Sequence, residues 1–172
     1  MLYQVPLEYT ITGTTAFAGD LLRSSVVDSD AQFFTRDPWS IQLGTGTAEI
    51  AWRPLPFEGT FSPEQVTVAM AFGGDLTMPG GKPRELEETT RCDPAADGCV
   101  LPQDGLPDVE VLDVRTGTWV QFAHMTQGRP YTLADAGRWV DPATGEVRIR
   151  FVNERPDPAY FQFPVAITGT IE

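Results

Sequence analysis

Hydrophobic and polar residues alternate over short segments of this chain. In Glu146–Val152, the alternate residues Val147, Ile149 and Phe151 are apolar, and the two positions between them hold arginines. A period of two puts alternate side chains on opposite faces of a strand, so this segment predicts a strand with one buried and one wet face. The segment Gln65–Phe72 has the same period with Thr or Ala at its alternate positions, which indicates a strand covered on both faces.

Other short segments share the composition of strands, being rich in β-branched and aromatic residues and bounded by Gly, Pro, Asp or Asn. These segments are Tyr9–Thr12, Ala31–Thr35, Ser40–Leu43, Ala48–Trp52, Val109–Val114, Thr118–Phe122 and Phe161–Thr168. The two segments described above add the predicted strands Val66–Phe72 and Glu146–Val152. The 15 Pro and 16 Gly interrupt most helical windows, and only Lys82–Arg91 or Leu133–Gly137 could hold a turn or two of helix. The prediction is one all-β domain over residues 1–172, an antiparallel β-sandwich of jelly-roll type with a long irregular loop at about 75–107.

The tripeptide Thr-Gly-Thr recurs along the chain with irregular spacing, and it closes two similar segments near the ends, Tyr9–Thr14 and Val165–Thr170. We interpret each copy as a strand end whose Gly provides a bulge or a positive φ, rather than as a ligand site. We also expect the two end segments to pair as antiparallel neighbours in one sheet.

The region between about residues 108 and 153 carries the segments "VEVLDVRTGTWVQF" and "GRWVDPATGEVRIRFVN". This succession of a strand, a Trp-bearing strand and a "DPATGEVRIRF" strand resembles galactose-binding-like jelly-roll modules of secreted or surface bacterial proteins. The resemblance implies a β-sandwich that binds a glycan or a protein on loops at one end or on one sheet face, often with a structural calcium. It implies no fixed ligand residue in this chain.

Composition limits the possible partners. The 172 residues are 41% apolar, with ten Phe and four Trp, which is enough for one substantial core. The formal charge of −12 repels phosphate backbones and anionic membranes, so we expect no nucleic-acid partner. No apolar run reaches the about 18 residues that a membrane span needs, so we expect no membrane insertion by this segment.

The cysteine pair Cys92 and Cys99 lies in a segment with a Pro and a Gly that favour a returning loop. We expect a local disulfide, which would contribute about 2–3 kcal/mol through the unfolded state if the native ring is unstrained. Free thiols are the alternative, and a zinc site is the weakest interpretation because the spacing is wrong and the sole histidine, His124, is distant in sequence.

Met1–Pro6 has no features of a signal peptide. A disulfide suits an oxidising compartment, so we expect an extracytoplasmic location, secreted or at the cell surface, with any anchor in a segment outside this sequence.

The Pro- and Gly-rich stretch from Asp75 to Pro107 is long for a loop in a compact domain. Three interpretations compete: a solvated excursion pinned by the disulfide, a loop that contacts a protein or a glycan, and a calcium site that uses Asp93 and Asp97. Calcium is the one cofactor that the sequence suggests, although the loop departs from the alternating acidic order of the best-known calcium loop.

Catalytic motifs are missing from the sequence. It contains no nucleophile elbow, zinc-protease helix, phosphate loop or dinucleotide fingerprint, and it has one histidine to serve as a base. Asp113, Asp135 and Asp141 flank predicted strands and are interpreted as turn formers. We therefore expect no enzyme, with two-carboxylate glycoside processing as the least favoured alternative.

Aromatic residues supply the candidate ligand contacts. Trp119 and Trp139 lie beside predicted turns, and with Tyr131 they could stack on sugar rings, whereas packing is the alternative for each. Trp39 and Trp52 are weaker candidates, and the tail Asn153–Phe163 carries aromatics that we expect to be exposed. The function that follows is a non-catalytic accessory or interaction module of a larger surface or secreted protein or assembly, with a carbohydrate-binding module as the alternative.

Overall fold

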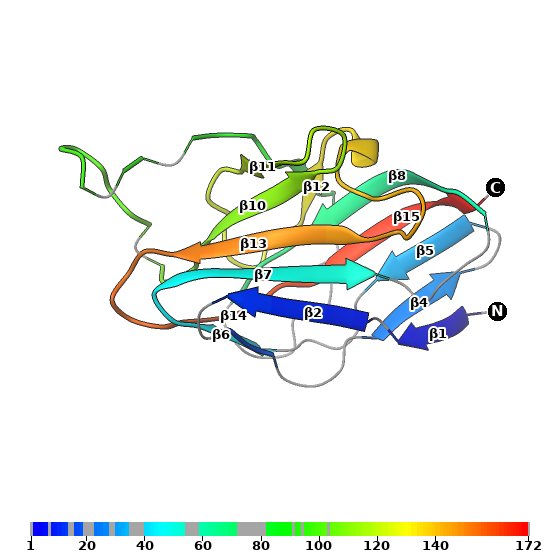
Figure 1. Cartoon of the computed structure of the whole chain (residues 1–172), viewed down its shortest axis with the longest axis horizontal. Helices are drawn as coiled ribbons and strands as arrows, with labels where there is room; N and C mark the ends of the chain where they lie inside the picture. The colour runs from blue at the N-terminus through cyan, green and yellow to red at the C-terminus, as the bar shows by residue number, and fades with distance from the viewer. Residues whose placement is uncertain are drawn as a thin grey trace.

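The computed structural model describes residues 2–6, 8–13, 16–18, 23–27, 30–34, 40–53, 59–71, 82–90, 92–93, 95–102 and 104–171. Side chains are described from Leu43 onward, except those of Ile50, Trp52, Arg53, Ala166 and Ile171. Within these ranges every regular element is a strand apart from one 3₁₀ turn, η1, at Ala136–Arg138 (Figure 1). The prediction of an all-β fold is therefore confirmed.

Two five-stranded sheets make up most of the fold. The first has the order β11-β10-β13-β7-β2, and the second has the order β5-β15-β8-β12-β9, in which the pair β12 and β9 is parallel and the other pairs are antiparallel. Smaller sheets join β14-β6-β3 and β1-β4. The strands are β1 (Leu2–Pro6), β2 (Glu8–Gly13), β3 (Ala16–Ala18), β4 (Arg23–Val27), β5 (Asp30–Phe34), β6 (Ser40–Leu43), β7 (Gly46–Arg53), β8 (Phe61–Val68), β9 (Arg84–Glu85), β10 (Asp108–Asp113), β11 (Thr118–Gln121), β12 (Tyr131–Leu133), β13 (Val147–Asn153), β14 (Ala159–Gln162) and β15 (Val165–Ile171).

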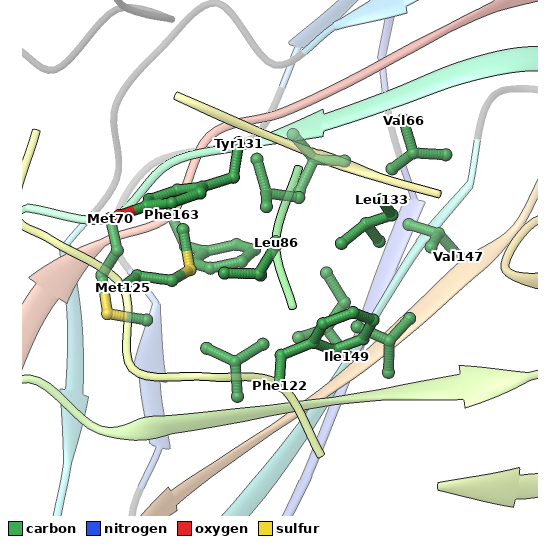
Figure 2. Close-up of a cluster of buried hydrophobic side chains, with 14 of the residues drawn as sticks. Val66, Met70, Leu86, Phe122, Met125, Tyr131, Leu133, Val147, Ile149 and Phe163 are labelled. Atoms are coloured by element: carbon green, nitrogen blue, oxygen red, sulfur yellow. The ribbon is translucent and has the colours of Figure 1, made fainter. Parts of the chain in front are cut away.

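One hydrophobic cluster fills the space between the two large sheets. Val147 and Ile149 of β13 meet Val66 of β8 and Leu133 of β12 in this cluster (Figure 2). The ring of Phe151 also packs at 4.9 Å, centroid to centroid, against the rings of both Phe161 and Phe163. The inner faces of the two sheets are thus joined by a shared core, as in a β-sandwich.

The alternation predicted for β13 is confirmed over Val147–Phe151 and ends there, because the next two residues, Val152 and Asn153, are both buried. Val147, Ile149 and Phe151 are fully buried, and the intervening Arg148 and Arg150 are half-buried on the other face. The prediction for Gln65–Phe72 is wrong in part, because β8 ends at Val68 and its outward side chains are accessible. Residues 69–71, beyond the strand end, are buried, whereas Phe72 lies outside the described residues.

The predicted pairing of the chain ends is wrong. β2 pairs with β7, whereas β15 lies between β5 and β8 in the other sheet. Similar patterns specify which face of a strand is buried but not which strand lies beside it, so the likeness of the two segments carried no pairing information. The Gly prediction is confirmed at Gly169, where the register with β8 shifts, and at Gly117, which has a φ of 72° in the β10–β11 turn.

Two further boundaries differ from the sequence expectation. The predicted strand Phe161–Thr168 is interrupted at Phe163 and Pro164, because proline has no N–H to donate to a ladder, and its two parts join different sheets. The possible helix at Lys82–Arg91 forms β9 and a bridge between Glu88 and Phe122 instead, with Arg91 outside the described residues.

The two ends of the described chain, Leu2 in β1 and Ile171 in β15, lie toward one end of the molecule (Figure 1). The loop between β9 and β10 extends at the opposite end. None of the helical structure in the described residues is long and apolar enough to cross a membrane.

Candidate functional site

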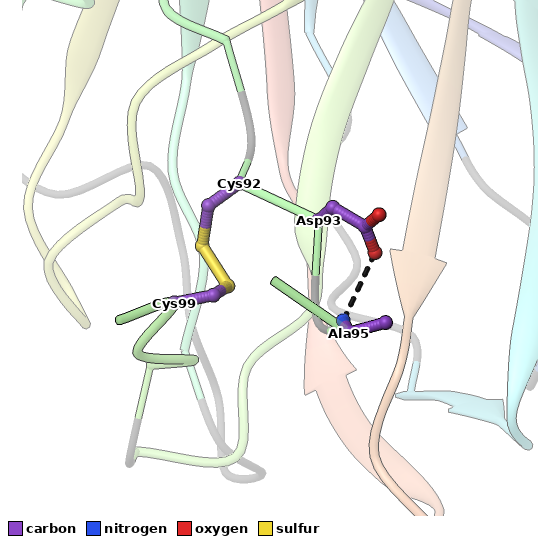
Figure 3. The surroundings of a disulfide bond; sticks show 4 residues. All are labelled: Cys92, Asp93, Ala95 and Cys99. Atoms are coloured by element: carbon purple, nitrogen blue, oxygen red, sulfur yellow. Dashed lines mark hydrogen bonds between the residues drawn. A yellow bond between two sulfur atoms is a disulfide. The ribbon is translucent and has the colours of Figure 1, made fainter. Parts of the chain in front are cut away.

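The loop between β9 and β10 is closed by a disulfide between Cys92 and Cys99, whose Cα atoms are 5.6 Å apart (Figure 3). The predicted local disulfide is therefore confirmed. Inside the ring, the backbone N–H of Ala95 donates to Oδ1 of Asp93 at 2.9 Å, and the N–H of Ala96 donates to the carbonyl of Asp93 at 2.9 Å. Gly98 has a φ of 84°, a conformation that glycine adopts without strain.

We define the tip loop as the described residues 92–93 and 95–100. Val100, the residue after the disulfide, is 77% exposed, which makes it the most accessible large apolar side chain among the residues whose burial is described. Asp93 and Asp97 are also exposed. The tip loop therefore presents one large apolar side chain and two carboxylates to solvent.

The chain that enters the tip loop is fixed to the body. Leu86 is buried, and its N–H donates to the carbonyl of Thr132 at 2.8 Å. Three residues later, the N–H of Thr89 donates to the carbonyl of Gln121 on β11 at 2.9 Å. The entering segment is thus an extension of the sheets up to residue 89.

The chain that leaves the tip loop is fixed separately. Nε2 of His124 lies 2.9 Å from a carboxylate oxygen of Asp104, and Leu106 is buried in the core. The guanidinium of Arg155 donates to the carbonyl of Pro102. Both sides of the loop base are therefore held by contacts that do not involve the disulfide.

A charged network lies under the entering segment. Arg138, in η1, pairs with Glu88 and donates from Nε to Asp113 at 3.0 Å. Burial alone would raise the pKa of Asp113, but hydrogen bonds from Arg138 and from the N–H groups of Arg115 and Thr116 outweigh it and lower that pKa. Burial would lower the pKa of Arg138, yet its two carboxylate partners raise it. The network therefore stays ionised and connects the loop to the body.

The outer face of the first sheet carries Trp119. Its ring centroid lies 4.5 Å from Cζ of Arg150 and 6.0 Å from Cζ of Arg148. Each arginine is held in turn by a glutamate, Glu110 for Arg150 and Glu49 for Arg148. Trp119 is half-buried, so part of the residue remains accessible.

The predictions for Trp139 and Tyr131 as ligand contacts are wrong. Trp139 is fully buried, stacks edge-on against Phe122 with ring centroids 5.3 Å apart, and donates from Nε1 to the carbonyl of Ala134 at 2.8 Å. Tyr131 is 8% exposed, and its hydroxyl accepts a hydrogen bond from the N–H of Thr126. Both rings therefore have their polar atoms satisfied inside the fold and offer no face for stacking. Trp39 and the side chain of Trp52 lie outside the described residues.

The tail aromatics divide into two groups. Tyr160 is 54% exposed, as predicted, whereas Phe161 and Phe163 are buried against Phe151. The turn interpretation is confirmed at Asp141, whose carbonyl accepts the N–H of Gly145 at 2.7 Å.

No metal centre is assembled in the described part of the chain, where no three His, Cys, Asp or Glu side chains are grouped to hold an ion. The carboxylate of Asp93 accepts the N–H of Ala95, and Asp97 is exposed on the same ring. The calcium site at these two residues stays a prediction.

Sequence reasoning missed Val100 and Arg138. The signal for Val100 was its place directly after Cys99, where a closed ring leaves no core within reach. Arg138 gave no signal, because its partners are 25 and 50 residues away.

No family model, no curated protein and no solved structure matches this chain.

Proposed function

We propose that this chain is a non-catalytic, extracytoplasmic interaction module with a jelly-roll β-sandwich, and that it contacts a protein partner through the tip loop. The single observation that carries the proposal is the exposed Val100, the residue after the Cys92–Cys99 disulfide. The loop between β9 and β10 that holds this disulfide extends at the end of the molecule opposite the two chain ends (Figure 1). Attachment of the module through either chain end leaves this loop unobstructed.

The form of the loop favours binding. An apolar side chain held at 77% exposure gains free energy when a partner covers it. The disulfide and the bonds from Ala95 and Ala96 to Asp93 limit the conformations of the loop before contact, so less entropy is lost on association. Preorganised loops on a rigid scaffold are a common position for binding residues.

Two properties support the environment that we propose. A disulfide persists in an oxidising compartment, which suits a secreted or surface protein. The formal charge of −12 favours partners that are neutral or basic over nucleic acid and anionic membranes.

The test is site-specific photo-cross-linking in the organism that produces the protein. A photoreactive residue at position 100 is expected to give a discrete product with a partner protein. The matched control is position 116, because Thr116 is exposed at the β10–β11 turn, away from the ring. Equal yields at positions 100 and 116, or no product at position 100 with the protein folded, would contradict the proposal.

Glycan binding is the second candidate, and the surface around Trp119 favours it. Two arginines and two glutamates form ion pairs around a partly accessible indole, which leaves a hydrogen-bonding surface with no net charge that suits a sugar ring. A glycan screen on the oxidised protein, with calcium and with a chelator, tests this candidate. Binding that Trp119→Ala removes and Tyr160→Ala retains would establish it, and no binding in either condition would reject it.

A further inference from the structure

The tip loop is organised from within. Among its described residues, the hydrogen bonds found join Ala95 to Asp93, Ala96 to Asp93, and Cys99 to Ala96. Each of these residues is exposed except Cys99, which is half-buried. The disulfide is thus the covalent bond that gives the ring its shape, and the core lies elsewhere.

The loop base does not depend on that bond. On the entering side Leu86 is buried and Thr89 is bonded to β11, and on the leaving side Asp104 contacts His124 and Leu106 is buried. Opening the ring therefore releases residues between two points that stay attached to the sheets.

Building on the function proposed above, we propose that the Cys92–Cys99 disulfide shapes the contact surface rather than stabilising the fold, and that its reduction by a dithiol switches partner binding off. Reduction leaves the β-sandwich folded and lets Val100 sample many conformations. Partner affinity then falls because the conformational entropy of the loop must be lost on binding.

The reduction balances as ordinary thiol–disulfide exchange. One thiolate of the dithiol attacks Sγ of Cys92, the more exposed cysteine, and the Sγ–Sγ bond breaks. Cys99 leaves as a thiolate and takes up a proton. The second thiol of the dithiol loses its proton and attacks the mixed disulfide, releasing Cys92 as a thiol and forming the oxidised, cyclic reductant. Two electrons pass from the dithiol to the two cysteines.

The β-sandwich stays folded after reduction because the disulfide restricts the tip loop in the native state as well as in the unfolded state. A disulfide stabilises a protein when it restricts the unfolded chain while the native fold would order that segment without it. In the tip loop the native order comes from the ring itself, so reduction frees this loop in the native and unfolded states alike. If the bond instead stapled the fold, so short a ring would raise Tm by about 5–10 °C.

The first measurement needs no partner. Thermal unfolding is compared for the oxidised protein, the protein in dithiothreitol, and the Cys92→Ser/Cys99→Ser variant, with hydrogen exchange at neutral pH. We expect a Tm change below about 2 °C and faster exchange confined to the tip loop. A fall of 5 °C or more, or faster exchange in β10 or β11, would overturn the inference.

The second measurement uses the photoreactive residue at position 100, with the oxidised and reduced proteins in parallel. A product with the oxidised protein that drops at least tenfold on reduction supports the switch. Equal yields in both states overturn the switch and leave the interaction module standing. No product in either state overturns the proposed function, and the switch with it, whereas the unfolding result still decides what the disulfide does for the fold.

Discussion

Arg138 donates from Nε to the carboxylate of Asp113 at 3.0 Å, and the side chain of Asp113 is 6% exposed. The same guanidinium lies 4.3 Å from the ring centroid of Trp139. This pair joins η1 to the end of β10, next to the segment that enters the tip loop, so its energetics bear on how firmly that loop base is held.

Asp113→Asn is expected to destabilise the protein by about 1–3 kcal/mol, because it removes the charge that compensates Arg138 in a buried position. The matched control is Asp135→Asn, at the Arg115–Asp135 pair, whose side chains are 55% and 50% exposed. That change is expected to cost less than about 1 kcal/mol, since solvent screens an exposed pair. Urea unfolding measures both, and equal costs would contradict a structural role for the Asp113 pair.

Asp113 also predicts a dependence of stability on pH. Its pKa in the folded protein lies below the ordinary value of 3.8, so its stabilising contribution is complete above pH 3.8 and is lost as pH falls through the folded pKa. The unfolded chain takes up the proton first, which favours unfolding. The difference in unfolding free energy between wild type and Asp113→Asn should therefore be constant at pH 5 to 7 and shrink below pH 3.8. A difference that stays constant to pH 2 would refute this assignment.

Gly169→Ala is expected to destabilise the protein by about 3 kcal/mol or more, because packing a methyl group against fixed backbone forces the strands apart. A Cβ at this position would lie 2.2 Å from the carbonyl oxygen of Ser62 and 2.9 Å from Cα of Pro63. Gly117→Ala is the control, since a Cβ there meets no atom within 4 Å and only the positive φ is costly. It should cost about 1–2 kcal/mol. Chemical unfolding distinguishes the two, and a smaller cost at Gly169 would show that β8 and β15 can separate locally.

Trp139→Ala is expected to cost about 3–5 kcal/mol, because it leaves a cavity against Phe122 and removes a satisfied indole N–H. Trp119→Ala is expected to cost about 1 kcal/mol, since its ring lies partly in solvent over Arg150. Denaturant unfolding provides the comparison, and acrylamide quenching of the single-Ala variants should show the more accessible indole in Trp139→Ala. A larger cost for Trp119→Ala than for Trp139→Ala would contradict the assignment of Trp139 to the core and of Trp119 to the surface.

Local patterns predicted local structure. The alternation around Ile149 identified both faces of β13, and the spacing of Cys92 and Cys99 identified the disulfide, because each depends on residues close in the sequence. Long-range relationships were not predicted. Trp139 follows a Gly-Arg pair beside a turn, which suggests exposure, but η1 turns its ring onto Phe122 and places Arg138 over it. The predicted pairing of the two end segments was wrong for the same reason, since the pattern of a strand does not specify which strand lies beside it.

The candidate site also combines local features that the sequence predicts with long-range contacts that it does not. The acidic residues of the tip loop and its closure could be predicted from composition, whereas the attachment of its base through His124 and Arg155 could not. Those contacts join segments that are 20 and 53 residues apart, and no local period records them.

The separation between the tip loop and its base has an evolutionary consequence. Replacements among residues 95–97 change no core contact, because these residues are exposed and their hydrogen bonds stay inside the ring. Selection could therefore alter the chemistry that the loop presents without a correlated loss of folding stability. Lineages descended from this protein are expected to diverge fastest between the two cysteines and to keep Leu86 and Leu106 apolar.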